Sequence, residues 1–261
     1  MTRIVLACSW YPRGELVRFH RYLPKLRSLY DDVVIAVSQS DSGFDAIAQW
    51  LRAEQIPFEV FEGWSGRHVC VRLAVQHGAD FIQYADLDRL LHWVECYPDE
   101  LADVVDRLSA QDLLILGRTA DAWATHPLSM FESEALFNTV FSDYFGREMD
   151  FGAGSRGLSR AAAEFVLRHS GDGDALAMDA GWSVLLKRGG FQWDYAACDG
   201  LEWETADQYH DTAADQAAQS ALAEESDSKT AHWALRVQVA RKIIHYGIQA
   251  MNHDLSEKDE V

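Results

Sequence analysis

Short apolar runs alternate with longer segments of helical spacing through the first half of the chain. Runs rich in β-branched and aromatic residues predict short buried strands. These runs are residues 4–8, 33–37, 58–61 and 81–84. Apolar residues recur at helical spacing in the segments between them, residues 16–29, 44–53 and 68–77. Strands separated by helices indicate a mostly parallel sheet with helices on both faces, where ligands bind beyond the carboxyl ends of the strands.

The second half continues this alternation less regularly. Pro98 and the two acidic residues after it suit the first turn of a helix. The further predictions are a helix from there to residue 108, a strand at 112–117, helices at 160–169 and 179–187, and a strand at 191–196. Residues 120–149 have a looser, aromatic pattern, which predicts a segment that wraps the open end of the sheet.

The C-terminal part is interpreted as a helical extension. Residues 211–230 are polar and predict either a solvated helix or a mobile connector. The last helix is predicted to have one apolar face, with Arg236, Arg241 and Lys242 largely off it. That face consists of Trp233, Val237, Ala240, Ile244 and Met251.

Charge and length restrict the possible partners. The chain has 261 residues, enough for one large α/β domain, and carries 41 acidic against 23 basic side chains, a formal net charge of −18. Such a charge opposes broad contact with nucleic acid or an anionic membrane. An anionic ligand would therefore need local arginines or a bound cation.

Cysteines and the N-terminus indicate the compartment. The four cysteines are scattered without a CxxC pair, which predicts reduced thiols rather than a zinc site or a disulfide framework. The first apolar run is too short for a signal peptide or a transmembrane segment. We therefore expect a cytoplasmic protein.

Two carboxylates follow the fourth predicted strand. The segment Tyr84-Ala85-Asp86-Leu87-Asp88-Arg89 places Asp86 and Asp88 two residues apart. In extended backbone such residues project to the same side, so both carboxylates are expected together past the strand end. Adjacent carboxylates repel unless a cation lies between them, and Mg²⁺ or Mn²⁺ prefers such oxygen ligands together with substrate phosphates. An isolated DxD triplet is also common in solvated turns, but this one stands where an α/β sheet binds ligands.

This arrangement resembles the GT-A glycosyltransferases, particularly the family 2-like group, over residues 3–205. The opening strand with its polar turn, the second strand with the acidic turn at Asp41, and the basic segment with Arg67 and Arg72 carry the resemblance. The acidic segment around Asp179, followed by a helix and two glycines, is also similar to the family. The sequence departs from the family in its rearranged Asp-Asp-Gly-Ser turn and in lacking the common Arg-Asn pair before the DxD strand.

The resemblance implies a GT-A (Rossmann-like) α/β fold and a metal-dependent transfer of a sugar from a UDP- or GDP-linked donor to a hydroxylated acceptor. Asp86 and Asp88 would bind Mn²⁺ or Mg²⁺, with Asp86 also near the ribose. The other implied donor-binding residues are Ser9, Trp10, Tyr11, Asp41, Arg67 and Arg72. Residues 152–157 are interpreted as a flexible loop on the acceptor side.

Two further residues receive roles from the resemblance. Asp179 would be the catalytic base that deprotonates the acceptor, which favours inversion, although an ordinary helix N-cap explains it equally well. Asp150 and Asp174 are the alternatives for the base. His210 would be an additional metal ligand from the C-terminal region, and His232 is its rival.

The predicted organisation is a glycosyltransferase domain at residues 1–205 and a helical extension at 206–261. The domain would divide into a nucleotide-binding half, residues 1–118, and an acceptor half, residues 119–205. The extension could form a homo-oligomer or pack on its own domain. The alternative functions are a non-catalytic binding or assembly module of the same fold and, less favoured because residues 7–14 contain one glycine, a nucleotidyltransferase.

Overall fold

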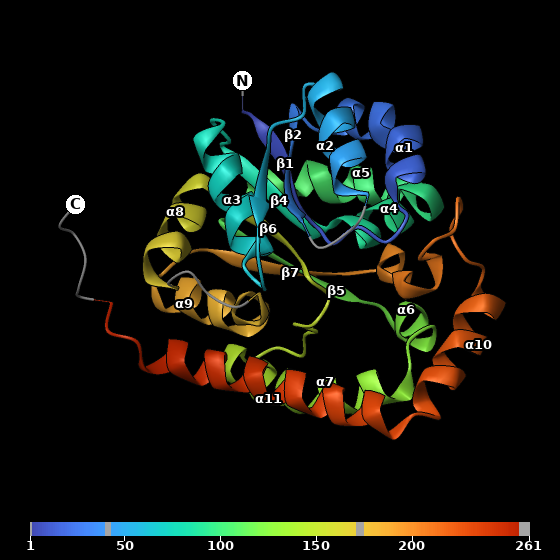
Figure 1. Cartoon of the computed structure of the whole chain (residues 1–261). Coiled ribbons are helices and arrows are strands. Elements are labelled where there is room, and N and C mark those ends of the chain that lie inside the picture. Colours follow the sequence, from blue (N-terminus) through green and yellow to red (C-terminus); the bar gives the residue numbers. More distant parts are fainter. Residues whose placement is uncertain (1, 40–42, 171–174, 256–261) are drawn as a thin grey trace.

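A computed structural model describes residues 2–39, 43–170 and 175–255. The sheet has seven strands in the order β3-β2-β1-β4-β6-β5-β7 (Figure 1). β6 is antiparallel to both of its neighbours, β4 and β5, and the other neighbouring pairs are parallel. The strands are β1 Ile4–Trp10, β2 Asp32–Ser38, β3 Phe58–Phe61, β4 Phe81–Asp86, β5 Leu113–Arg118, β6 Ser155–Ser159 and β7 Trp193–Cys198.

Helices cover both faces of the sheet, because alternate side chains of the buried strands point to opposite sides. Leu6 and Cys8 of β1 lie in one core with α1, α2, α4 and α5. Val5 and Ala7 lie in the other core with α3, α7, α8, α9 and α11. The α-helices are α1 Leu16–Leu29, α2 Phe44–Ala53, α3 Gly66–Gln76, α4 Leu87–Cys96, α5 Pro98–Arg107, α6 Ala120–Ala124, α7 Leu128–Phe145, α8 Arg160–His169, α9 Ser183–Arg188, α10 Gln216–Asp227 and α11 Thr230–Asn252.

Short helical turns complete the chain. A π-helical turn, η2 Met178–Trp182, precedes α9. The 3₁₀ turns are η1 Leu108–Ala110, η3 Asp199–Leu201 and η4 Glu204–Asp207. The mostly parallel sheet with flanking helices confirms the predicted fold class.

Two segments between residues 119 and 205 differ from the prediction. Residues 128–145 form the 18-residue helix α7, whereas the aromatic pattern there predicted only a loose wrapping segment. The glycine-rich segment at 152–157 runs into β6, where Ser155 and Gly157 pair with β4 and β5, so the interpretation of a flexible loop is wrong from residue 155 onward. Both differences arise because tertiary packing decides these segments, since neither has a clear apolar period.

The C-terminal helix packs on its own chain. α11 runs alongside α7 and past the end of α9 (Figure 1), and its residues Ala240, Ile243 and Ala250 belong to the same core as α7 and η2. Arg236 lines an internal cavity together with Val239 and Ile243 of the same helix, so the expectation that it points away from the buried face is wrong. No helix in the described ranges is long and apolar enough to span a membrane.

Candidate functional site

Asp86 ends β4 at the carboxyl edge of the parallel strands. The register between β1 and β4 places Ser9 opposite Asp86, and the Ser9 hydroxyl donates to the Asp86 carboxylate at 2.6 Å. The Tyr84 hydroxyl donates to the same carboxylate, and Arg67 forms an ion pair with it at 2.8 Å. Burial alone would raise the pKa of Asp86, but Arg67 and Arg89 outweigh it and lower the pKa to about 2. Asp86 is therefore a fixed anion at neutral pH.

Asp88 is placed differently from the prediction. The extended backbone ends at Asp86, and α4 begins at Leu87, so Asp88 lies in the first helical turn and the two carboxylates do not project from one side of a strand. Burial, together with the negative charges of Glu204 and Asp86, raises the pKa of Asp88 to about 7. The Arg13 guanidinium lies 3.7 Å from its carboxylate.

Arg67 joins the acidic end of β4 to a turn in the second half of the chain. It lies in the first turn of α3, where its Nη2 atom is 2.8 Å from Asp86 and its Nη1 atom is 2.8 Å from Asp179. Asp179 lies in the π-helical turn η2, an irregularity that is frequent at functional sites. Burial raises the pKa of Asp179 although Arg67 and Arg156 oppose this shift. One guanidinium thus holds together two carboxylates that are far apart in the sequence.

The aromatic residues at the end of β1, Trp10 and Tyr11, do not share one environment. Trp10 is 1% exposed, lies edge-on to Phe19 and donates through its indole nitrogen to Glu15, so a nucleotide base cannot stack on it. Its implied role in donor binding is therefore corrected to a position in the core. Tyr11 is partly exposed, and its hydroxyl donates to the Gly63 carbonyl at 2.8 Å. Trp64, which the sequence analysis did not single out, lies beside Tyr11 and is 62% exposed.

Two predicted residues, Arg72 and His210, are not brought to this group, and two others lie outside the described residues. Arg72 pairs with Glu59 of β3 at 2.7 Å on the surface. Asp41 lies outside the described residues, as does the alternative base Asp174. His210 is exposed, and its backbone N–H donates to Asp207. No set of three or more His, Cys, Asp or Glu side chains within the described ranges could hold a metal ion, so Asp86, Asp88 and His210 do not form a ready ligand set.

Glu204, rather than His210, connects the segment after β7 to the site. Its carboxylate pairs with Arg89 of α4 at 2.9 Å, and both side chains are buried. Arg89 also donates to the Ala153 carbonyl and lies 3.8 Å from Asp86. Arg89 follows the DxD triplet directly, but its sequence position gave no sign of its partner.

A buried histidine fixes the same C-terminal segment to α4. His92 contacts Asp207 at 2.8 Å and Glu202 at 2.9 Å, and Asp207 also pairs with Arg18 of α1 at 2.8 Å. Burial alone would lower the pKa of His92, but its hydrogen bonds to these acids raise the pKa to about 11. His92 is therefore a charged tie between α4 and η4.

Glycine is required where the loop before β6 passes the site. Gly154 has φ +62°, and a Cβ atom there would lie 2.9 Å from the Asp86 carboxylate and 3.0 Å from Arg67. A Cβ at Gly152 would collide with Glu134 and with Arg118. The loop can pass between these charged groups only because neither residue has a side chain.

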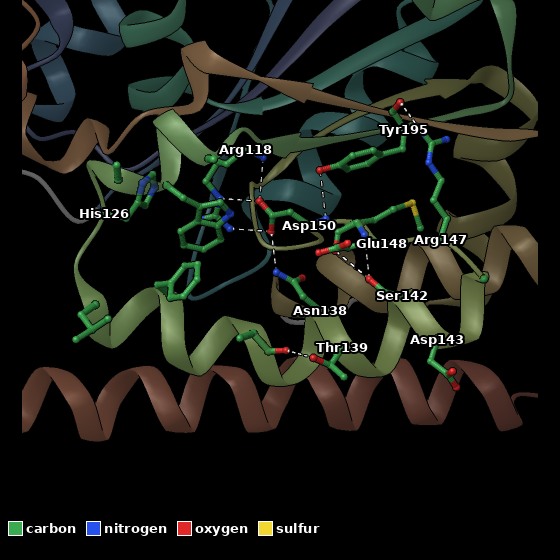
Figure 2. Close-up of a pocket in the computed structure, with 18 residues that line it drawn as sticks. Arg118, His126, Asn138, Thr139, Ser142, Asp143, Arg147, Glu148, Asp150 and Tyr195 are labelled. Carbon is green, nitrogen blue, oxygen red and sulfur yellow. Dashed lines mark hydrogen bonds and ion pairs between the residues drawn. The ribbon is translucent and has the colours of Figure 1, made fainter.

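A large cavity lies between α7 and the strands β5 and β7 (Figure 2). Its volume is about 1250 Å³. At one end Arg118 pairs with Asp150 at 2.7 Å and stacks on Trp123 at 3.5 Å. Arg118 outweighs the effect of burial and holds the pKa of Asp150 well below its usual range, which makes Asp150 a poor base. Arg118 also pairs with Glu134, which faces a second, smaller cavity next to Asp179.

No protein-family model matches the chain, and no curated protein matches it by sequence. Among solved structures, the chain is similar to glucosyl-3-phosphoglycerate synthase from Mycobacterium tuberculosis in complex with Mn²⁺, UDP and glucosyl-3-phosphoglycerate. Sequence identity is 10% and the TM-score is 0.55, over 98% of this chain and 82% of that chain. A structure of the same synthase with Mn²⁺, UDP and phosphoglyceric acid matches at 10% identity and a TM-score of 0.52, over 98% of this chain and 80% of that chain. At this identity the likeness shows the fold, which is that of GT-A glycosyltransferases.

Proposed function

We propose that this protein transfers a sugar from a nucleotide-diphosphate-sugar donor to a hydroxyl group of an acceptor. The observation that carries the proposal is the bridge through Arg67, which holds Asp86 at the carboxyl end of β4 next to Asp179 from the acceptor half. Ligands of such sheets bind beyond the carboxyl ends of the strands. Arg67 therefore brings together in one site Asp86, on the proposed donor side, and Asp179, the proposed base for the acceptor. The similar synthase structures, which contain Mn²⁺ and UDP, support this proposal.

Asp88 is the residue that best fits a divalent cation. Its carboxylate is half-buried, and this desolvation together with the nearby acidic residues Glu204, Asp86 and Glu15 opposes its ionisation. A hard cation relieves such crowding and takes its remaining ligands from water and substrate phosphates, which suits a site that lacks a closed protein cage. We infer that Asp88 holds Mn²⁺ or Mg²⁺, with Asp86 beside it. Such an ion acts as a Lewis acid that stabilises the departing diphosphate.

Asp179 is the proposed general base. Its raised pKa makes it a stronger base than an exposed aspartate, while the Arg67 ion pair fixes one of its oxygens. In the reaction, Asp179 accepts the proton of the acceptor hydroxyl as that oxygen bonds to the anomeric carbon. The bond from this carbon to the diphosphate oxygen breaks, and the nucleoside diphosphate leaves with the bonding electrons. Attack opposite the leaving group inverts the anomeric configuration.

The large cavity is the proposed entrance for the acceptor. It is lined by aromatic side chains such as Trp123 and Phe131 and by the polar side chains of Asn138 and Thr139 (Figure 2). Such a mixture suits a hydroxylated molecule with an apolar part. The ion pair of Arg118 with Glu134 separates this cavity from the one that Asp179 lines.

The test is a panel of UDP- and GDP-sugars with and without Mn²⁺, read by thermal shift and donor hydrolysis. Mn²⁺ with UDP or GDP should raise the melting temperature because it binds the native state. Asp88→Asn should abolish this shift and leave the unliganded protein folded. The matched control is Asp99→Asn, which removes an exposed carboxylate from the equivalent first turn of α5.

Each alternative has its own outcome. An unchanged shift in Asp88→Asn contradicts the metal assignment. Nucleotide binding without turnover of any donor would favour a binding module, and pyrophosphate release from a nucleoside triphosphate and a sugar phosphate would favour nucleotidyl transfer.

A further inference from the structure

A small cavity separates the candidate site from the C-terminal helix. Its volume is about 110 Å³, and side chains of α3, α4, α7, η2, η4 and α11 reach it. Asp179, the proposed base, lines it, whereas Asp86 and Asp88 do not. The cavity therefore lies on the acceptor side of Arg67.

Two of the three arginines that line this cavity are neutralised by protein carboxylates. Arg67 pairs with Asp179 and Asp86, and Arg89 pairs with Glu204. The carboxylates that line the cavity are those of Asp179, Glu204 and Glu134. Glu134 pairs with Arg118, which does not line this cavity. Each carboxylate that faces the cavity thus already has an arginine of its own.

Arg236 of α11 is the arginine that remains. Among the described residues it makes no hydrogen bond and no ion pair, and Glu134 and Glu204 act on it only at longer range. Partial burial lowers its pKa, because these two carboxylates do not fully compensate the lost solvation. Removing a guanidinium from water without a partner is costly, and such groups are normally paired. An arginine keeps its charge under these conditions, so the cavity holds an unsatisfied cation.

The place of Arg236 in its helix is also unusual. It precedes Ala240, Ile243, Gly247 and Ala250 at helical spacing, and these four residues form the buried face of α11. A Cβ at Gly247 would collide with the ring of Phe141, so the close packing of α11 on α7 at this glycine fixes which face points inward. This packing directs Arg236 into the cavity rather than into solvent.

The cavity is too small for a nucleotide sugar. Ligand pockets for molecules of drug size occupy roughly 300–1,000 Å³, and one water accounts for about 30 Å³. About 110 Å³ suits a single carboxylate or phosphate group. Such a group would give Arg236 the bidentate partner that it lacks.

We infer that Arg236 binds a carboxylate or phosphate group of the substrate, and that this group belongs to the acceptor. The assignment to the acceptor rests on the proposed function, because it uses Asp179 as the acceptor base. The anion site itself does not depend on it.

The experiment is calorimetric titration of the full chain with inorganic phosphate, in a buffer free of metal and nucleotide. Wild type is expected to bind phosphate, and Arg236→Gln should bind it about tenfold more weakly or not at all, as loss of a charge-assisted contact predicts. Arg241→Gln is the matched control, since it removes the same charge from an exposed position of the same helix and should bind as wild type does. Arg236→Lys, which keeps the charge but not the fork, should bind with intermediate affinity.

A second titration with UDP and Mn²⁺ distinguishes the acceptor from the donor. Arg236→Gln should bind UDP as tightly as Arg241→Gln does. A weaker affinity for UDP in Arg236→Gln alone would overturn the assignment to the acceptor. Equal phosphate binding by both variants, or none by wild type, would overturn the anion site. If phosphate binding depends on Arg236 but the protein transfers no sugar, the anion site is supported and only the proposed function is contradicted.

Discussion

Arg67 is the residue on which the candidate site depends most directly. Its two terminal nitrogens each lie 2.8 Å from a carboxylate, one of Asp86 and one of Asp179. The resemblance implied donor binding by Arg67, whereas in the structure two protein carboxylates already pair with its guanidinium. In the proposed reaction, a diphosphate that reaches Arg67 would have to replace one of these partners, which would free Asp179 or Asp86 as the donor binds.

The role of Asp179 can be separated from donor binding. Asp179→Asn removes the proposed base but keeps the shape of the side chain, so the rate constant kcat should fall about 100- to 10,000-fold. The thermal shift with UDP and Mn²⁺ should remain, because Asp86 and Asp88 are unchanged. Steady-state kinetics of the variant measure both effects. Asp103→Asn, an exposed substitution on α5, should retain wild-type kcat, and a fall of kcat under tenfold in Asp179→Asn would reject the base assignment.

At the scale of elements, the sequence predicts well where the periodic signal is strong. The bounds predicted for α1, α2, β3 and α8 agree with the structure, because apolar residues there mark the faces that the sheet buries. The pattern fails for β6, whose five buried residues include Arg156 and two serines. It also fails for the buried face of α11, because hydrophobicity favours Ile244 and Val237 while the fit of Gly247 to Phe141 turns Ile243 inward.

The same limit applies to the site. Asp86, Arg67 and Asp179 could be selected from the sequence because each stands at the end of an element in a family-like order. Glu204 and Arg236 could not, because their relation to Arg89 and to the cavity arises from tertiary packing.

The loop before β6 gives a test at this scale. Gly154→Ala places a Cβ against Asp86, Arg67 and Arg89 and also strains a backbone with φ +62°. Gly146→Ala has nearly the same φ, +73°, but nothing lies within 4 Å of its new Cβ. Each variant should therefore lose about 1–2 kcal/mol of stability from the left-handed conformation, and only Gly154→Ala should also lose UDP binding. Urea unfolding and thermal shift measure the two effects, and equal UDP binding by both variants would contradict the packing of this loop against the site.

Helix α7 forms one wall of the large cavity and offers a test of acceptor entry. Ala135→Trp should fill part of the cavity and raise KM for the acceptor severalfold, because the larger side chain takes up the space between α7 and the strands. Hydrolysis of the donor in the absence of acceptor should be unchanged. Leu136→Trp is the control, since this neighbouring side chain is 56% exposed and does not line the cavity. Equal KM values for the two variants would place the acceptor elsewhere.

At the scale of the whole molecule, the segment after β7 is held against the N-terminal part of the chain. Charged contacts link it to α1 and α4 through Arg18, Arg89 and His92, and α11 adds side chains to the core beneath the sheet. The proposed boundary at residue 205 therefore separates regions of sequence that share one core. Because these buried cations are paired with carboxylates, the free energy of unfolding should depend on pH, and that dependence can be traced to single groups.

His92 gives that dependence a defined sign. Its pKa is raised to about 11 in the folded state, whereas an unfolded histidine has a pKa of about 6.5. The folded protein thus keeps a proton that the unfolded chain releases above pH 6.5. The stabilisation that the charged His92 gives the folded state is complete below about pH 6.5. It is lost as the pH rises from there towards 11, by up to about 1.4 kcal/mol per pH unit. Urea unfolding at pH 7, 8 and 9 should show this decline in wild type and in His20→Gln, a control at an exposed position of α1, and a flatter profile in His92→Gln. The same slope in all three proteins would mean that His92 is not the charged tie between α4 and η4.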